Sequence, residues 1–484
     1  MNRFTIALLL LGVGLRTAAF ASERSLWIDE AMVALNIVER NPARLFEPLD
    51  RNQGAPVGFL LAMKASVELF GPTERALRLP AFLASLVGLF AFGSAAYRLL
   101  PRASAHLALA LVAVSPSLVS YAAECKQYSF DAAFAALLLA LAVPFFQGPA
   151  NWKIWLAFAG VGAVSVWCSH PAIFVLAGFG LALVAQAIHL RDRSRLLGLL
   201  SLGGIWLMSF AAVYSVNLQH LGQNDYLIRY WAGHFAPWPT SRSGIVWYVD
   251  HGLAFVHESA GMTPEVKLAE VLMLGTLLWG IIECKRMTRG YLGTAIAFLV
   301  TLLIALLASS VHLYPFAGRL LLFLVPMACL VWSCGAYRVT RGYGLAWLIA
   351  VWPLILSFQE IRQPARTEDL PPLLDCIKNE WREGDRIYVY GGSGDAGAGP
   401  AFDFYSPRYN FPPEAVFRGG IHRENPSRYL DEIAALPEGR IWILFSHRHK
   451  EEESLILQDF EAVSRFHRSQ QGVGASVYIY FKPR

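Results

Sequence analysis

Apolar runs of about 17 to 22 residues recur along the 484-residue chain, and each is long enough to cross a bilayer as a helix. Only 16% of the residues are charged, against roughly a quarter in an average soluble protein. This pattern predicts an α-helical polytopic membrane protein and excludes collagen, a disulfide scaffold, intrinsic disorder and a lone cytosolic enzyme. The eleven predicted spans are 4–21, 79–97, 103–121, 129–146, 153–169, 171–189, 196–216, 266–283, 291–310, 319–337 and 343–360.

The first run has two interpretations. Its basic start and its small residues around Ala19 imitate a secretory signal peptide. Arg16 lies inside the run and counts against cleavage, so we expect a retained membrane anchor. Both interpretations place Ser22 on the outside.

Basic residues predict the orientation, because short loops rich in Lys and Arg face the cytoplasm. Five alternate loops are basic, so the opposite side receives the loops 22–78, 122–128, 169–170, 217–265 and 311–318 and everything after residue 361. We therefore expect an inner-membrane protein with these parts outside the cytoplasm, and no nucleic-acid partner. The basic loops hold Arg98 and Arg102, then Lys153, then Arg191, Arg193 and Arg195, then Lys285, Arg286 and Arg289, then Arg338 and Arg341.

The C-terminal residues 361–484 differ from the transmembrane domain 1–360, since they hold 16 basic and 18 acidic residues. Strand-like and helix-like runs alternate there, which predicts a small soluble α/β domain on the external side. The predicted strands are Arg386 to Tyr390, Arg440 to Phe445 and Ala475 to Phe481, and the predicted helices lie near 369–382, 427–435 and 450–467.

A glycine pattern, Gly392 to Gly397, follows the first predicted strand of this domain and matches G-x-G-x-x-G. No convincing helix begins inside it, so a flexible turn is favoured over a nucleotide site. The six cysteines, among them Cys284, show no paired spacing and predict neither a zinc site nor a disulfide framework.

Three polar clusters lie on the predicted external side. In the first, Asp29 and Glu30 follow Trp27, and apolar residues at helical spacing continue to Asn41. This predicts an amphipathic helix on the membrane surface, where an acid would meet the head group of a lipid-linked substrate. Acids in a first helical turn also complement the helix dipole, which is the structural alternative.

The second cluster lies between two apolar runs and has an i, i+3, i+4, i+7 pattern, which predicts one polar face at a helix mouth. Asp131 is the most telling member, because ionisable groups inside a membrane helix need water, a partner or a ligand. An internal salt bridge with Lys126 or an arginine is the structural alternative. The members of the pattern are Glu124, Gln127, Tyr128 and Asp131.

The third cluster, His312 to Arg319, lies at the external mouth of the tenth span. Arg319 either snorkels to the lipid head groups or grips a substrate phosphate. His170, before Pro171 at another external turn, is more often a hydrogen-bonded cap than a catalyst. The aromatic loop 217–265 is expected to form an interfacial belt rather than to cover the site.

These segments resemble the GT-C glycosyltransferases. Within that superfamily they are similar to the bacterial branch of the dolichyl-phosphate-mannose protein mannosyltransferases and to the lipid A aminoarabinose transferases. The resemblance covers most of residues 1 to 330. It rests on Trp27-Ile28-Asp29-Glu30, Gln53-Gly54-Ala55-Pro56, Arg75-Ala76-Leu77-Arg78-Leu79-Pro80, Tyr121 to Asp131, Ser169-His170-Pro171 and Gly318-Arg319.

The resemblance implies transfer of a sugar from a polyprenyl-phosphate carrier to an acceptor protein, lipid or glycan outside the cytoplasm. Family members place an aspartate of the first loop at the active site, and Asp29 matches it, with Glu30 as its acidic neighbour. Asp131 resembles the acid of the second external loop. Relatives often carry a basic residue or His before a Pro-Pro pair where this chain has Gln53, so Lys126 and Arg319 become the expected phosphate contacts.

The expected chemistry follows from charge. Asp29, with Glu30 beside it, would accept the proton of the attacking group, while cations neutralise the departing lipid phosphate. A single displacement inverts the anomeric carbon, so we expect an inverting glycosyltransferase. The expected substrate-binding residues are Gln53, Glu124, Lys126, Tyr128, Asp131, His170 and Arg319.

Two other classes stay open. A lipid-linked sugar flippase would place charges near the bilayer midplane in repeated halves, and a non-enzymatic envelope polysaccharide protein would use mainly the C-terminal domain. No metal ligand set is predicted. A divalent ion is nevertheless an open alternative, because Asp29, Glu30, Glu124 and Asp131 offer hard oxygen ligands.

Overall fold

The computed structural model describes residues 2–22, 24–283, 288–340, 343–363, 368–447 and 450–483. The predictions for Cys284, Lys285, Arg286 and Arg341 lie outside these residues. The chain divides into two compact units, each of which is described by itself. The membrane unit is Met1–Ser22, Pro42–Pro48 and Gly54–Arg362, and the α/β unit is Glu23–Asn41, Leu49–Gln53 and Gln363–Arg484.

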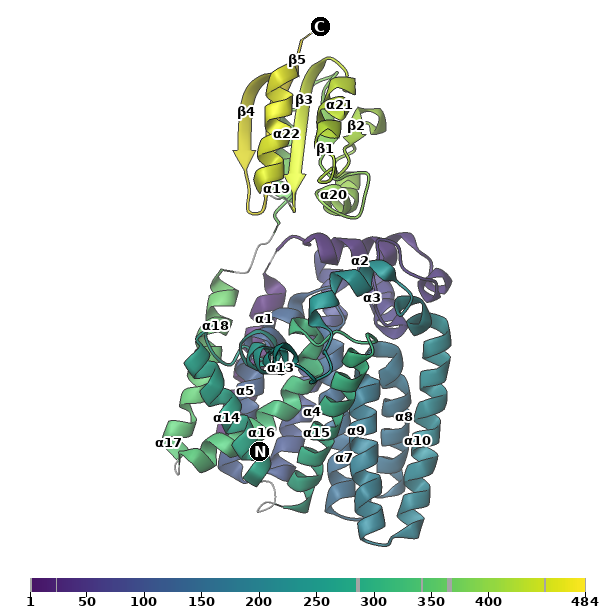
Figure 1. Cartoon of the computed structure of the whole chain (residues 1–484), viewed down its shortest axis with the longest axis vertical. Coiled ribbons are helices and arrows are strands. Elements are labelled where there is room, and N and C mark those ends of the chain that lie inside the picture. Colours follow the sequence, from purple (N-terminus) through teal and green to yellow (C-terminus); the bar gives the residue numbers. More distant parts are fainter. Residues whose placement is uncertain are drawn as a thin grey trace. The chain divides into compact units, whose positions relative to one another are not determined.

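Long apolar helices make up the membrane unit (Figure 1). Among the described residues, eight stretches are long and apolar enough to cross a membrane, and the bent pair α5 (Arg102–Val114) and α6 (Pro116–Ser120) adds a ninth if it counts as one span. The first four are Arg3–Ala21 (α1), Glu74–Leu99 (α4), Tyr128–Gln147 (α7) and Ala172–His189 (α9). The other four combine or lie within elements: Arg193–Leu221 (α10, Arg193–Val213, with η3, Tyr214–Leu218, and α11, Gln219–Leu221), Gly290–Ser310 (in α15, Arg289–Ser310), Gly318–Val339 (η7, Gly318–Leu324, with α16, Val325–Val339) and Gly344–Arg362 (α17, Tyr343–Ala346, with α18, Leu348–Arg362).

The other two predicted spans are also helices. They are α8 (Trp152–Cys168) and α14 (Lys267–Glu283), with 17 residues each. All eleven predicted runs therefore coincide with helices, and the fold class is confirmed. Shorter elements fill the connections: η1 (Pro42–Phe46), α3 (Val57–Phe70), η2 (Tyr121–Ala123), α12 (Asp225–Tyr230), η4 (Ala232–His234), α13 (Arg242–Ala254) and η5 (Phe255–Ser259).

The first helix is tied into the membrane unit by a buried arginine. Arg16 in α1 is 2% exposed, and its guanidinium donates hydrogen bonds to the carbonyls of Val112 and Ala113 in α5 at 3.0 Å. Those carbonyls belong to the last turn of α5, before the break between α5 and α6. The last carbonyls of a helix accept no hydrogen bond within the helix, so they are available to the guanidinium. The retained membrane anchor stays a prediction. At the centre of the unit, α16 is buried on all sides from Val325 to Ala336.

The α/β unit contains a five-stranded sheet in the order β2-β1-β3-β5-β4 (Figure 1). Strand β1 (Arg386–Val389) pairs in parallel with β2 (Val416–Arg418) and with β3 (Gly439–Ser446). Strand β5 (Ala475–Lys482) pairs antiparallel with β3 and with the edge strand β4 (Arg465–Gln471). The helices are α2 (Ile28–Glu39) from the first loop, α19 (Pro371–Asn379), α20 (Gly399–Tyr405), α21 (Ser427–Ala435) and α22 (Lys450–Val463).

Three predicted strands and three predicted helices of this domain are confirmed, and three elements were missed. The missed elements are β2, α20 and β4. The helix predicted over 450–467 ends at Val463, because the chain then enters β4. All seven residues of β4 are exposed, so no apolar alternation marks this edge strand in the sequence.

The prediction that α2 is an amphipathic helix lying on the membrane surface is wrong. The bounds of α2 agree with the predicted start and stop, but the helix does not have the exposed polar face of a helix lying on the membrane surface. Glu30, Asn36 and all five residues between them are buried. The helix is therefore packed inside the protein, and a polar side chain on it must find a partner within the protein or a ligand.

Candidate active site

The segment that leads into α2 is held by the C-terminal residues of the same α/β unit. Ser25 Oγ donates a hydrogen bond to Asp369 Oδ1 at 2.6 Å, and the Leu26 amide donates to the Tyr405 hydroxyl at 2.8 Å. Two residues later, the Ile28 amide donates to Glu368 Oε2 at 2.9 Å. The start of the helix that carries Asp29 is thus fixed by three hydrogen bonds from one domain.

Glu368 takes the place of a local helix cap. Trp27 occupies the N-cap position of α2 but its side chain does not cap the helix, whereas an N-cap side chain usually accepts from the first free amides. The buried Glu368 carboxylate accepts from the first of them instead. Its charge also suits the positive end of the helix dipole.

A histidine completes this arrangement. His447 Nδ1 donates a hydrogen bond to the other carboxylate oxygen, Glu368 Oε1, at 2.7 Å. That hydrogen bond raises the pKa of His447, burial opposes the change, and the charges of Glu368 and Asp29 raise the pKa further. Asp29 is therefore close enough to His447 for their charges to interact.

The carboxyl ends of the three parallel strands lie along this same side of the unit. The glycine-rich loop follows β1, Arg418 ends β2, and His447 follows β3. Open α/β sheets bind ligands outside the carboxyl ends of their strands. The protein uses part of this edge to hold the first loop.

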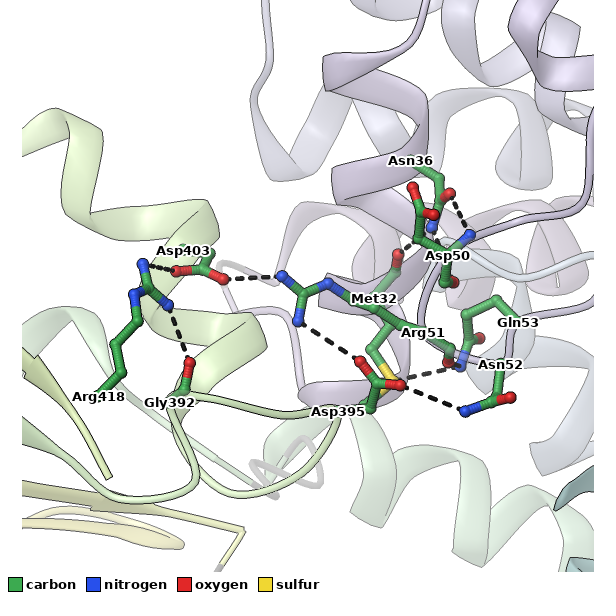
Figure 2. Close-up of polar contacts among 10 residues, drawn as sticks. All are labelled: Met32, Asn36, Asp50, Arg51, Asn52, Gln53, Gly392, Asp395, Asp403 and Arg418. Carbon is green, nitrogen blue, oxygen red and sulfur yellow. Dashed lines mark hydrogen bonds and ion pairs between the residues drawn. The ribbon is translucent and has the colours of Figure 1, made fainter. Parts of the chain in front are cut away.

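Gln53 belongs to the second piece of the first loop, residues 49–53 (Figure 2). Its Nε2 lies 3.2 Å from Met32 Sδ and 3.3 Å from the Arg51 carbonyl. Asn36 fastens the same piece to α2, because it donates to the Asp50 carbonyl and accepts from the Asp50 amide.

In the membrane unit, the second predicted cluster differs from the expected helical face. Helix α7 begins only at Tyr128, and Glu124 is extended at the end of η2, so the four residues do not share one helix. Tyr128 and Asp131 occupy the first turn of α7. Glu124, Lys126 and all the others of this cluster are buried.

Gln127 Oε1 and Asp131 Oδ1 are buried oxygens of this cluster with no hydrogen-bond partner at bonding distance among the described residues. The Ser169 hydroxyl interacts with the carboxyl group of Asp131. Gln127 and Asp131 are one helical turn apart, since the Asp131 amide donates to the Gln127 carbonyl at 3.1 Å. Buried polar atoms are normally satisfied, so these two point to a bound ligand, ion or water.

Arg319 meets the mouth of α7. Its guanidinium carbon lies 5.5 Å from the centre of the Tyr128 ring, a cation–π distance. Tyr314 is close to the same place, because the charges of Asp131 and Tyr128 contribute to raising its pKa, although burial is the larger cause. The structure therefore brings together members of the second and third predicted clusters.

His170 is hydrogen-bonded, as predicted, but to a side chain and not to a helix end, since Ser169 and Pro171 hold the cap positions of α8 and α9. Its Nε2 donates to Asn217 Oδ1 at 3.0 Å, and Asn217 Nδ2 donates to the Ala55 carbonyl at 3.4 Å. Burial lowers the pKa of His170 to about 4, and the bond to Asn217 opposes the shift. The imidazole is neutral near pH 7.

The described residues contain no group of three or more His, Cys, Asp or Glu side chains that could hold a metal ion. Sequence reasoning missed Glu368, Tyr405 and His447 in the α/β unit and Asn217 in the membrane unit. His447 could have been found, because it lies two residues beyond the end of the predicted strand Arg440 to Phe445. No sequence pattern marked Glu368 as functional, since acidic residues are common in polar connecting segments.

Residues 54–214, a stretch of the membrane unit, match the family described as dolichyl-phosphate-mannose-protein mannosyltransferase. No curated protein matches the chain. Among solved structures, the oligosaccharyltransferase of Archaeoglobus fulgidus with Zn and sulfate aligns over 99% of this chain and 73% of its own, with 11% identity and a TM-score of 0.51.

Two further structures are similar. The oligosaccharyltransferase AglB of Archaeoglobus fulgidus, in complex with an inhibitory peptide and a dolichol-phosphate, aligns over 98% of this chain and 74% of its own, with 12% identity and a TM-score of 0.50. ArnT of Cupriavidus metallidurans aligns over 98% and 97%, with 15% identity, but its TM-score of 0.44 is too low to carry an argument. The chain therefore has the GT-C fold of membrane glycosyltransferases and, in residues 54–214, is similar to the dolichyl-phosphate-mannose-protein mannosyltransferases.

Proposed function

We propose that this protein is an inverting glycosyltransferase that moves a sugar from a polyprenyl-phosphate carrier to an acceptor outside the cytoplasm, at the bacterial inner membrane. The family match supports sugar transfer. The structure of AglB contains a dolichol-phosphate, so a protein of this fold binds a lipid phosphate of the proposed class.

The fixed start of α2 is the observation that carries the proposal. A catalytic carboxylate must be held in place, because a misplacement of about 1 Å can cost a hundredfold in rate. Asp29 is partly exposed, while the three residues before it are Leu26, Trp27 and Ile28, two of which are hydrogen-bonded to Tyr405 and Glu368. An acid with this support is suited to act as a base.

In the proposed step, an acceptor hydroxyl or amine attacks the anomeric carbon. The new bond forms as the bond from that carbon to the phosphate oxygen breaks, and the acceptor proton passes to Asp29. The lipid phosphate leaves with the bonding electron pair. A phosphate needs no acid to protonate it, so a second carboxylic acid of the glycosidase type is unnecessary.

Cations of the membrane unit would stabilise the departing phosphate. Arg319 and Lys126 are the proposed pair, and low dielectric strengthens their effect. The two unsatisfied oxygens, Gln127 Oε1 and Asp131 Oδ1, would accept hydrogen bonds from sugar hydroxyls. Tyr128, Glu124, His170 and Gln53 complete the proposed substrate-binding set.

The test uses full-length protein with a radiolabelled polyprenyl-phosphate sugar and membrane acceptors. Asp29→Asn should reduce transfer by roughly a hundredfold or more, the usual range for loss of a general base. Glu47→Gln is the matched control, because Glu47 is an exposed acid of the same loop whose ion pair with Arg44 lies on the surface.

Full activity of Asp29→Asn would overturn the assignment of the base. Movement of the intact lipid across the bilayer, without transfer of the sugar, would instead show a flippase.

A further inference from the structure

A cleft of about 330 Å³ lies within the α/β unit, between α2 and the glycine-rich loop (Figure 2). We call it the glycine-loop cleft. Its volume is in the range of pockets that hold small molecules, roughly 300 to 1,000 Å³. Leu35 is the one aliphatic side chain among the described residues that line it. The lining residues are Leu35, Asn36, Glu39, Asp50, Arg51, Gly392, Ser393, Gly394, Asp395, Asp403 and Arg418.

The cleft occupies the position where α/β domains bind ligands. Gly392, Ser393 and Gly394 follow the end of β1, and Arg418 is the last residue of β2. These parallel strands are neighbours in the sheet, so the cleft lies outside their carboxyl ends. In this chain, α2 from the first loop closes the opposite side.

Both arginines of the cleft are already engaged. Arg51 donates to Asp403 Oδ2 at 2.8 Å and lies 3.9 Å from Asp395, while Arg418 lies 2.6 Å from Asp403 Oδ1. Arg418 also donates to the Gly392 carbonyl at 3.0 Å. Figure 2 shows Arg51 reaching between the two aspartates.

The charge balance selects among ligands. Two arginines face four acids, and two of those acids, Glu39 and Asp50, are not paired with the arginines of the cleft. Asp50 pairs with Arg40 but is 70% exposed. A carboxylate or phosphate would meet net negative charge. A group rich in hydroxyls, with or without an amine, would find carboxylate acceptors.

The cleft lies on the helix that carries the proposed catalytic acid. Leu35 and Glu39 are 6 and 10 residues beyond Asp29 in α2. At 1.5 Å per residue, this places the cleft about 9 to 15 Å along the helix from Asp29. A short oligosaccharide spans that distance.

We propose that the glycine-loop cleft binds a sugar residue of the acceptor, and hence that the acceptor is a glycan whose bound residue is neutral or carries an amine. This inference rests on the proposed function, which it deepens by naming the acceptor class. The sugar hydroxyls donate to Glu39, Asp50 and Asp395. The end of the same glycan reaches Asp29.

Gly394 allows the cleft to be filled without disturbing the backbone. A Cβ atom at this position meets no atom within 4 Å, and the backbone there is not left-handed. Gly394→Trp adds a large ring at a residue that lines the cleft, and Gly394→Ala is the matched control because it adds only a methyl group to open space.

The measurement is binding of three trisaccharides to the full-length protein in lipid nanodiscs: a neutral mannose trimer, a glucosamine trimer and a galacturonic acid trimer. The neutral or the amino trimer should bind to the wild type and to Gly394→Ala. Gly394→Trp should weaken that binding by roughly tenfold or more, a loss of about 1.4 kcal/mol. The acidic trimer should not compete.

Binding should persist in Asp29→Asn, because that residue lies outside the cleft. Failure of both neutral and amino trimers to bind the wild type, or equal binding to Gly394→Trp, overturns the inference and leaves the proposed function standing. Absence of sugar transfer by the wild type overturns the proposed function, while the Gly394 dependence of trisaccharide binding still decides the cleft.

Discussion

Single residues show how burial fixes charge state in this protein. His170 lies at a turn between α8 and α9, outside both helices, yet its pKa falls to about 4. At pH 7 it is a neutral hydrogen-bond donor to Asn217 and not a cation for a phosphate. Arg319, by contrast, keeps its charge at any physiological pH. His170 is therefore not a cation of the proposed donor site, which leaves the proposed pair Arg319 and Lys126.

The low pKa of His170 predicts a loss of stability in acid. Its folded pKa, about 4, lies below the unfolded value of about 6.5. Between these values the unfolded chain binds the extra proton, so stability falls as the pH drops from 6.5 toward 4. The expected loss is on the order of 1–3 kcal/mol.

Thermal unfolding of the detergent-solubilised protein at pH 7.5, 6, 5 and 4 measures this effect. His170→Gln keeps an amide that can donate to Asn217 and removes the titration, so its melting temperature should fall less between pH 6.5 and 4 than that of the wild type. Identical acid profiles for the two proteins would remove His170 as the cause.

For single residues, the sequence predicted which polar side chains cluster better than it predicted their burial and their neighbours. The pattern from Glu124 to Asp131 marked a polar cluster correctly, but it did not show that α7 starts at Tyr128 or that Lys126 is buried. Whether Arg319 lies beside Tyr128 depends on the packing of η7 against α7. Contacts between residues almost 200 positions apart leave no local pattern.

At the scale of elements, the start of α2 depends on a distant part of the chain. Helices commonly receive their first cap from a neighbouring Ser, Thr, Asp or Asn. Here Glu368, more than 300 residues away, supplies the acceptor, and Tyr405 holds the residue two positions earlier. The C-terminal domain is thus a positioning element for Asp29. The strands that frame it were predictable, whereas this contact was not.

This dependence predicts the effect of two substitutions. Glu368→Ala leaves the Ile28 amide without its charged acceptor, a bond worth about 1.5–3 kcal/mol. If the loss is felt mainly in the position of Asp29, kcat should fall roughly tenfold to a hundredfold while the KM for the lipid donor changes little. Tyr405→Phe, which removes a neutral bond, should act in the same direction and more weakly.

Tyr409→Phe is the matched control for this pair. It removes a hydroxyl that donates to the Pro371 carbonyl at 3.2 Å, inside the C-terminal domain and away from the first loop. It should leave kcat unchanged. A higher KM for the lipid donor with an unchanged kcat for Glu368→Ala would contradict a positioning role. So would equal effects of Tyr405→Phe and Tyr409→Phe on kcat.

For the whole molecule, the α/β unit constrains the membrane topology. Ser25, Leu26 and Ile28 contact residues 368–405, so the first loop and the C-terminal domain share one side of the bilayer. The chain between them must then cross an even number of times. Nine or eleven spans satisfy this condition, and eight or ten do not. The pair α5 and α6 therefore counts as one span if α8 and α14 either both cross the membrane or both do not.

The eleven-span count follows if α8 and α14 both cross. Each has 17 residues, about 25 Å of helix, which is the lower limit for a span. The sequence predicted all eleven helices because apolar runs are a local signal. It could not predict that part of the first loop joins the C-terminal domain, since no periodicity records which chain segments pack together.

Cysteine labelling tests the orientation that the basic loops predict. Ser427 in α21 and Ser194 in α10 are both exposed, and Ser→Cys barely changes side-chain size at either site. With Cys376 replaced by Ser to remove the partly exposed thiol of the α/β unit, a membrane-impermeant maleimide should label Ser427→Cys in spheroplasts. Ser194→Cys lies beside Arg191, Arg193 and Arg195 and should react only after permeabilisation. The reverse pattern would put Asp29 on the cytoplasmic side and reverse the predicted orientation. Labelling of both sites in intact spheroplasts would instead support nine spans, with neither α8 nor α14 crossing the membrane.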